Sequence, residues 1–162
     1  MKLVILSFSI ALTTSMASAS PPCTADDIRS LRRMTACEWE TLFRNGKAEC
    51  LPLGTHKGVI LEAEGSRLKA RLQGLVWKGK DFDGNGTMIN RWTGFRAVTA
   101  EVSHGTSWLD GQACIVLQYA QDAKIFPGVR DELRQIGPGL WLGRGYDGTK
   151  RTHTVDFILQ TR

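Results

Sequence analysis

The sequence predicts a mainly β protein, an antiparallel up-and-down β-barrel preceded by one or two N-terminal helices. After Pro52, short segments rich in β-branched and aromatic residues alternate with glycine turns. No helix-length segment separates these predicted strands, which excludes parallel βαβ construction. A meander of about eight to ten short strands hides its edges most simply by closing into a barrel. A β-sandwich is the alternative architecture.

The N-terminal helices are predicted over residues 24–45. Thr35 and Glu38 have the spacing of a capping box, so a second helix is expected to begin at Ala36. Its end is expected at Gly46, because glycine commonly follows the last helical residue.

The strands are predicted from the alternation of side chains and from the turn residues between them. Residues 129–136 fit both a helix and a strand. Their apolar residues have helical spacing, whereas Arg130, Glu132 and Arg134 alternate as on one face of a strand. The remaining strands are expected at residues 56–63, 68–76, 77–82, 87–92, 95–103, 113–119, 140–146 and 152–159.

Residues 1–19 have the features of a secretory signal peptide. Lys2 provides a positive start, residues 3–12 are mostly apolar, and Ala17-Ser18-Ala19 is a small-residue cleavage site. The apolar run is too short to cross a bilayer as a helix, so no membrane span is expected. These features predict that the protein is exported, either to the periplasm or out of the cell. Its organisation is a signal peptide at 1–19, a helical segment at 20–49 and an antiparallel β-barrel at 50–162.

The mature chain is mildly basic. The full chain has a net charge of +5, and removal of Lys2 with the signal peptide leaves +4. No basic stripe with interleaved aromatic residues is present, so nucleic acid is not an expected partner. The histidines lack the spacing of a helical metal pair, and phosphate-binding loops are absent. The sequence therefore indicates no cofactor and no metal.

Four cysteines in an exported protein suggest two disulfides. If one helix begins just after Cys23, then Cys37 lies about 20 Å along it, far beyond the reach of a disulfide. The favoured pairing is therefore Cys37–Cys50 together with Cys23–Cys114.

The stretch DFDGNG, residues 81–86, resembles the start of an EF-hand calcium loop. An EF-hand needs a bidentate acid at its twelfth position, where this chain has Trp92, and it needs a helix on each side, where this chain has predicted strands. Asp-Gly and Asn-Gly pairs are strong hairpin signals. The segment is therefore interpreted as a surface turn between two strands, with a weak calcium site as the alternative.

Three stretches carry a resemblance to known proteins: WKGKDF at 77–82, SWLDG at 107–111, and RDELR at 130–134 followed by PGLWLG at 138–143. Together they resemble a group of small bacterial exported proteins of unassigned function, over residues 36–160. That group in turn resembles the lipocalin-like, or calycin, barrels. The resemblance implies a barrel with a lipophilic ligand, and it brings no catalytic residues.

The leading functional hypothesis is a lipocalin-like barrel that binds a small, partly apolar molecule, with an anionic group as one option. Arginines and aromatic residues are interleaved along the predicted strands, and an inward arginine can hold a carboxylate with bidentate geometry. The candidate anion contacts are Arg91, Arg96, Arg130 and Arg134. The candidate cavity walls are Trp77, Trp92, Trp108 and Tyr119.

Two alternatives remain open. In an enzyme of the same shape, Asp110, Asp131 and Glu132 would act as general acids or bases at the barrel mouth, which requires at least one carboxylate buried beside a cavity. In a structural or interaction protein of the cell envelope, the barrel would be filled and an apolar patch would lie on its outside.

Overall fold

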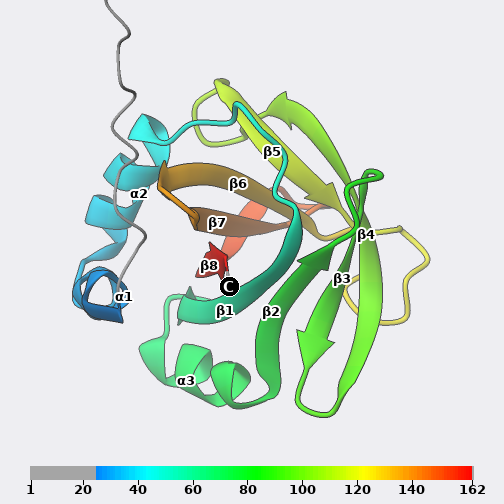
Figure 1. Cartoon of the computed structure of the whole chain (residues 1–162), viewed down its shortest axis with the longest axis horizontal. Helices are drawn as coiled ribbons and strands as arrows, with labels where there is room; N and C mark the ends of the chain where they lie inside the picture. Colours follow the sequence, from blue (N-terminus) through cyan, green and yellow to red (C-terminus); the bar gives the residue numbers. More distant parts are fainter. Residues whose placement is uncertain (1–24, 162) are drawn as a thin grey trace, which may run out of the picture.

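The computed structural model describes residues 25–161 and shows one closed barrel of eight antiparallel strands (Figure 1). Each strand pairs with the next along the chain, and β8 pairs with β1, so the up-and-down barrel predicted from the sequence is confirmed. The strands are β1 Gly54–Ala63, β2 Trp77–Phe82, β3 Thr87–Trp92, β4 Phe95–Thr106, β5 Ala113–Gln118, β6 Arg130–Gly137, β7 Leu140–Asp147 and β8 Thr152–Thr161.

Most predicted strands lie where the alternation placed them, and β2 and β3 have the predicted bounds. The ambiguous segment 129–136 is strand β6. Its alternating charged residues share the outer face of the barrel, whereas Asp131 and Leu133 point into the interior. Each of the outer charges has an ionic partner, so the strand alternation outweighs the helical spacing of the apolar residues.

Residues 68–76 were predicted to form a strand, and this prediction is wrong: Arg67–Val76 is helix α3. The hydroxyl of Ser66 caps the helix by accepting a hydrogen bond from the backbone N–H of Lys69. Leucine, lysine, arginine and alanine are strong helix formers, and they dominate this segment. Leu68, Ala70 and Leu72 alternate with polar residues, as in a strand, but Leu68, Leu72 and Leu75 recur at helical spacing.

Two N-terminal helices, α1 Ala25–Leu31 and α2 Ala36–Asn45, lie side by side on the outside of the barrel (Figure 1). The predicted capping box is present, because Thr35 and Glu38 each bond the other's backbone N–H. A hydrophobic core separate from the barrel interior fills the space between these helices and strands β1, β5, β7 and β8. Its buried members are Leu31, Trp39, Phe43, Leu61, Cys114, Val116, Leu140, Leu142 and Ile158.

Arg134 joins α2 to the barrel wall. Its guanidinium forms a bidentate pair with the Asp110 carboxylate, at 2.7 and 2.8 Å. It also donates hydrogen bonds to the backbone carbonyls of Phe43, at the end of α2, and Ala113, at the start of β5. The side chain of Arg134 is buried, so this is an internal anchor rather than a surface charge.

The four connections β1–β2, β3–β4, β5–β6 and β7–β8 meet at one end of the barrel, because consecutive strands are antiparallel. We call this end the mouth. The β1–β2 connection contains α3, and the β5–β6 connection spans residues 119–129. The hydroxyl of Thr93, in the β3–β4 turn, donates to the carbonyls of Leu75 and Val76 and so ties that turn to the end of α3.

The predicted Cys37–Cys50 disulfide is wrong, since both are exposed free thiols. Cys37 lies on α2 and Cys50 in the segment that leads to β1, and the two sulfur atoms are not bonded. Cys114 is buried, and burial followed by the charge of Glu132 raises the pKa of its thiol to about 12. Its predicted partner Cys23 and the predicted signal peptide lie outside the described residues. No described helix has the length and apolar character needed to cross a membrane.

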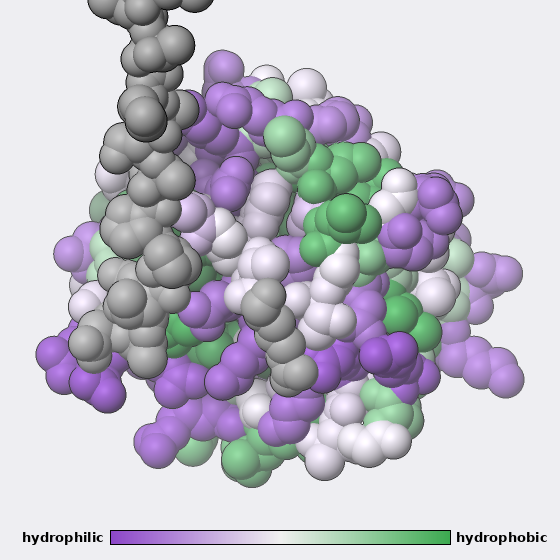
Figure 2. Space-filling model, viewed as in Figure 1, coloured by the Kyte–Doolittle hydropathy of each residue, from purple (hydrophilic) through white to green (hydrophobic). Residues whose placement is uncertain are grey.

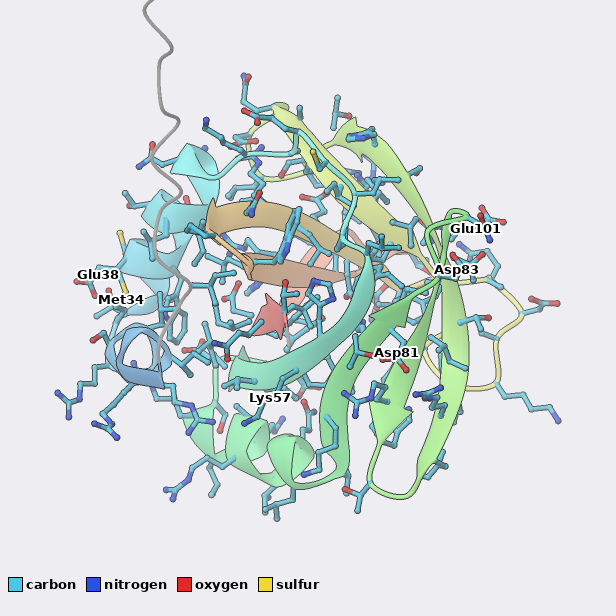
Figure 3. The ribbon with its side chains drawn as sticks, viewed as in Figure 1. Met34, Glu38, Lys57, Asp81, Asp83 and Glu101 are labelled. Carbon is cyan, nitrogen blue, oxygen red and sulfur yellow. The ribbon has the colours of Figure 1, made fainter. Side chains whose placement is uncertain are left out.

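The DFDGNG segment forms the end of β2 and the turn into β3, as expected. Oδ1 of Asp83 accepts hydrogen bonds from the backbone N–H groups of Asn85 and Thr87, so the turn itself occupies this carboxylate. Figure 3 shows Asp83 close to Glu101, which pairs in register with Thr87. Asp81 forms ion pairs with Arg91 on β3 and Arg96 on β4.

Candidate functional site

A cavity of about 310 Å³ lies inside the barrel and reaches the mouth. This volume is at the lower end of the range for small-molecule sites. Apolar surface dominates its walls. The lining residues are Ile60, Gln73, Val76, Trp77, Lys80, Asn90, Trp92, Tyr119, Phe126, Val129, Asp131, Thr154, Val155 and Phe157.

Lys80 and Asp131 form an ion pair in this cavity, with Nζ 3.0 Å from Oδ2. Their side chains are only 3% and 7% exposed, respectively. The Lys80 ammonium also lies over three aromatic rings, 5.6 Å from the centroid of Trp77, 5.4 Å from Tyr119 and 5.3 Å from Phe157. These rings add cation–π attraction to the ion pair.

Hydrogen bonds link the ion pair to its polar neighbours. Lys80 donates to Oδ1 of Asn90 at 3.0 Å and to the hydroxyl of Tyr119 at 2.7 Å. The indole N–H of Trp77 donates to the same Asn90 oxygen, and the Asn90 amide donates to Tyr119 and to the carbonyl of Val98. We call Trp77, Lys80, Asn90, Tyr119 and Asp131 the polar cluster.

The electrostatics of the cluster keep Lys80 charged. Burial on its own lowers the pKa of Lys80, but the Asp131 carboxylate and the Tyr119 hydroxyl outweigh burial, so its pKa is raised. Burial, followed by the charge of Asp131, raises the pKa of Tyr119 to about 12. Tyr119 therefore remains a neutral hydroxyl at physiological pH, and it donates to Oδ2 of Asp131 at 3.2 Å.

One acceptor of the polar cluster is left open. Oδ2 of Asp131 contacts both Lys80 and Tyr119, but none of the described residues donates a hydrogen bond to Oδ1. The oxygens of Asn90 and Tyr119 each already accept two hydrogen bonds. Because Asp131 lines the cavity, its Oδ1 is the acceptor that a bound molecule can use.

Two glycines make room for the cluster. At Gly79 φ is +124°, and an added Cβ would lie 2.1 Å from the carbonyl oxygen of His56. A bulge between Trp77 and Gly79 follows from this conformation and turns Lys80 inward. Across the barrel, a Cβ on Gly145 would lie 2.9 Å from Oδ1 of Asp131. Glycine at these positions therefore allows both charged side chains to enter the interior.

Aromatic side chains form the rim of the cavity. Trp92 stacks against Phe95 at a centroid distance of 6.2 Å and against Phe126 at 6.1 Å. Phe126 also makes an edge contact with Tyr119. The β5–β6 connection thus covers part of the opening with an aromatic ring.

Three of the four predicted wall residues lie together in this cavity, namely Trp77, Trp92 and Tyr119. Trp108 does not lie there. Its ring is on the outer side, between the guanidinium groups of Arg130 and Arg151 at 4.7 and 5.1 Å, and it lines a separate open hollow of about 530 Å³.

The four arginines named as anion contacts do not line the cavity. Arg91 and Arg96 pair with Asp81. Arg130 pairs with Glu132, and Arg134 pairs with Asp110.

The three carboxylates considered for an enzyme are separated. Asp131 lies in the cavity, but Glu132, the next residue of β6, points to the outer face. There it accepts hydrogen bonds from the Ser107 hydroxyl, the Trp108 backbone N–H and Arg130. The hydrogen bonds from Arg134 lower the pKa of Asp110. No two of these three carboxylates share a site.

Lys80 and Asn90 were not identified from the sequence. In a regular strand that places Trp77 inside, Lys80 would point outward, and only the bulge at Gly79 reverses this. A signal was available, because Trp77 and Phe82 are five positions apart and a regular strand would place them on opposite faces. Gly79 lies between them, and an isolated glycine in a strand marks a bulge.

No protein-family model matches the sequence, and no curated protein matches it either. A crystal structure of a protein from Thermomonospora curvata is similar in fold. It is 19% identical in sequence with a TM-score of 0.59, and the match covers 85% of this chain and 95% of that chain. At this identity the likeness shows the fold alone. It agrees with the closed antiparallel barrel, and the resemblance to lipocalin-like barrels and to a group of exported proteins stays a prediction.

Proposed function

We propose that the protein binds a small, mainly apolar molecule with one hydrogen-bond donor, such as a hydroxyl group, inside the barrel. The open Oδ1 of Asp131 at an otherwise satisfied polar cluster carries this proposal. The apolar walls would hold the rest of the molecule. The donor would give Oδ1 of Asp131 a partner inside a mainly apolar cavity, where a hydrogen bond to a charged group is strong.

The charge balance of the cluster favours a neutral ligand over an anion. Lys80 is already neutralised by Asp131. A carboxylate in the same place would face the Asp131 carboxylate across a short distance with little water between them, and like charges repel strongly in such surroundings. We therefore propose a neutral ligand in place of the anionic one that the sequence allowed.

Tryptophan fluorescence provides a direct test of binding in the cavity, because Trp77 and Trp92 line it. We expect titration with 1-octanol to change the emission in a saturable manner. A Val155→Phe variant should reduce this binding by about tenfold or more, because the larger ring fills the cavity from the β8 wall. A Leu53→Phe variant, at a position that is 66% exposed, is the matched control and should bind like the wild type.

A folded protein whose emission does not respond to 1-octanol would contradict the proposal. So would equal binding by wild type and the Val155→Phe variant, because the alcohol would then bind elsewhere. The thermal unfolding midpoints of both variants establish that they are folded.

We also propose that the protein acts outside the cytoplasm, which rests on the signal-peptide features of residues 1–19. N-terminal sequencing of the protein isolated from its native host tests this proposal. A mature chain that begins at Ser20 is the expected result, and an intact Met1 in the abundant form would contradict it.

A further inference from the structure

Most of the exposed large hydrophobic side chains lie at the mouth of the barrel. Nine large hydrophobic side chains are exposed among the described residues, and seven of them belong to α3, the start of β4 or the β5–β6 connection. Figure 2 shows hydrophobic side chains among hydrophilic ones along its lower edge, where α3 lies in Figure 1. These seven residues, the mouth patch, are Leu68, Leu72, Leu75, Val76, Phe95, Ile125 and Phe126.

Helix α3 presents the largest part of the mouth patch. Leu68, Leu72 and Leu75 recur at intervals of four and three residues, so they share one face of the helix. They are 68%, 59% and 68% exposed, whereas Ala70 is buried against the barrel. The helix thus turns its apolar stripe away from its own protein, which is the reverse of an ordinary surface helix.

The charges around the mouth patch are predominantly positive. Helix α3 contains three basic residues and no acidic one. Counted over residues 64–78, 93–96, 119–129 and 147–151, the mouth end has eight lysines or arginines and three aspartates or glutamates. Exposed leucines with basic neighbours on one helix are the pattern of a helix that lies in a membrane interface, where anionic headgroups attract the basic side chains.

We propose that the mouth patch docks the protein on the surface of an anionic lipid bilayer. The leucines of α3 would enter the boundary between headgroups and acyl chains, and the basic side chains would contact the headgroups. A second copy of this chain fits less well, because it would bring the same positive charge to the contact. The hydrogen bonds from Thr93 to Leu75 and Val76 hold α3 beside the β3–β4 turn, so the parts of the patch form one surface.

Vesicle flotation of the full chain tests this inference without any cavity ligand. We expect the protein to float with vesicles of phosphatidylcholine and phosphatidylglycerol and to remain unbound with phosphatidylcholine alone. Each basic residue near such a surface contributes about fivefold to the partition coefficient at low salt. Raising the salt to 0.5 M should therefore reduce binding by about tenfold or more, because the charges are screened.

A Leu68→Gln/Leu72→Gln/Leu75→Gln variant should lose about tenfold or more of the binding to anionic vesicles. Glutamine is a good helix former and these side chains are exposed, so the fold should be unaffected. Leu51→Gln/Leu53→Gln, which changes two exposed leucines outside the mouth, is the matched control and should bind like the wild type. Circular dichroism melting establishes the folding of both.

Three results would overturn the inference. One is the absence of wild-type flotation with anionic vesicles, and another is equal flotation of wild type and the triple variant. The third is a wild-type dimer in sedimentation equilibrium that the triple variant does not form, because a second copy would then cover the patch. The triple variant should still bind 1-octanol, because its substitutions lie outside the cavity. Cavity binding and bilayer docking can therefore be tested independently of each other.

Discussion

Nζ of Lys80 lies 3.0 Å from Oδ2 of Asp131, across the interior of the barrel. Lys80 is on β2 and Asp131 is on β6, and these strands are not neighbours in the sheet. The ion pair therefore connects separate parts of the wall through the cavity. A buried pair of this kind costs much desolvation free energy, and losing one partner leaves the other charge uncompensated.

The first prediction concerns this pair. Replacing Lys80 with methionine should reduce the free energy of unfolding by about 3–5 kcal/mol, because Asp131 would remain as a buried charge without its cation. Urea unfolding at pH 7 measures this loss. The double variant Lys80→Met/Asp131→Leu should recover most of it, because both charges are then absent. A double variant as unstable as the sum of both single variants would contradict the coupling.

The second prediction concerns the pair between Arg134 and Asp110 on the outer face. An Asp110→Asn substitution should reduce the free energy of unfolding at pH 7 by about 1.5–3 kcal/mol, the range for hydrogen bonds to charged groups. Asp122→Asn, at an exposed position, is the control and should change it by less than about 0.5 kcal/mol.

The same pair predicts an acid dependence. The hydrogen bonds from Arg134 lower the pKa of Asp110 in the folded protein. Its stabilising contribution is therefore complete above the unfolded pKa of about 3.9 and is lost as the pH falls through the folded pKa. The stability difference between wild type and Asp110→Asn should shrink below about pH 4. A difference that stays constant down to pH 2 would contradict the assignment.

The third prediction concerns His56, which is buried near the end of the barrel opposite the mouth. Burial lowers its pKa below the ordinary value of 6.5. Nδ1 lies 3.2 Å from the carbonyl of Gly54, which can only accept, so Nδ1 carries the proton and Nε2 accepts from the Thr161 hydroxyl. The stability that depends on neutral His56 is complete above about pH 6.5 and is lost as the pH falls through the lower folded pKa.

NMR titration of the His56 ring checks this prediction. The expected midpoint is below 6.5, with the Nδ1–H tautomer at neutral pH. A midpoint at or above 6.5 would show that burial does not control this group.

The fourth prediction concerns the backbone at Gly79. A Gly79→Ala substitution places a Cβ against the carbonyl of His56 at a residue with positive φ, so it should destabilise the protein by more than about 2 kcal/mol. Gly74→Ala in α3 is the matched control, because nothing lies within 4 Å of its added Cβ. It should stabilise the protein by about 0.5–1 kcal/mol. Thermal unfolding of both variants gives the comparison.

The barrel was predictable because its strands are short, alternate in polarity and end at turn residues, as at the β2–β3 turn. Helix α3 was not, because Leu68, Ala70 and Leu72 also alternate with polar residues as on a strand, and the exposed side of a helix carries no packing signal. The cavity walls Trp77, Trp92 and Tyr119 were identified as large amphipathic residues. Lys80 was missed because a single bulge at Gly79 reverses the direction of every side chain beyond it.

The ratio of two dissociation constants tests the central claim most directly. 1-Octanol and methyl octyl ether have the same octyl chain, but only the alcohol can donate a hydrogen bond to Oδ1 of Asp131. The wild-type protein should bind the alcohol about tenfold to a hundredfold more tightly than the ether, as expected for a hydrogen bond to a buried charged group. The Lys80→Met/Asp131→Leu variant should bind the two about equally. Equal affinity of the wild-type protein for both molecules would contradict the account.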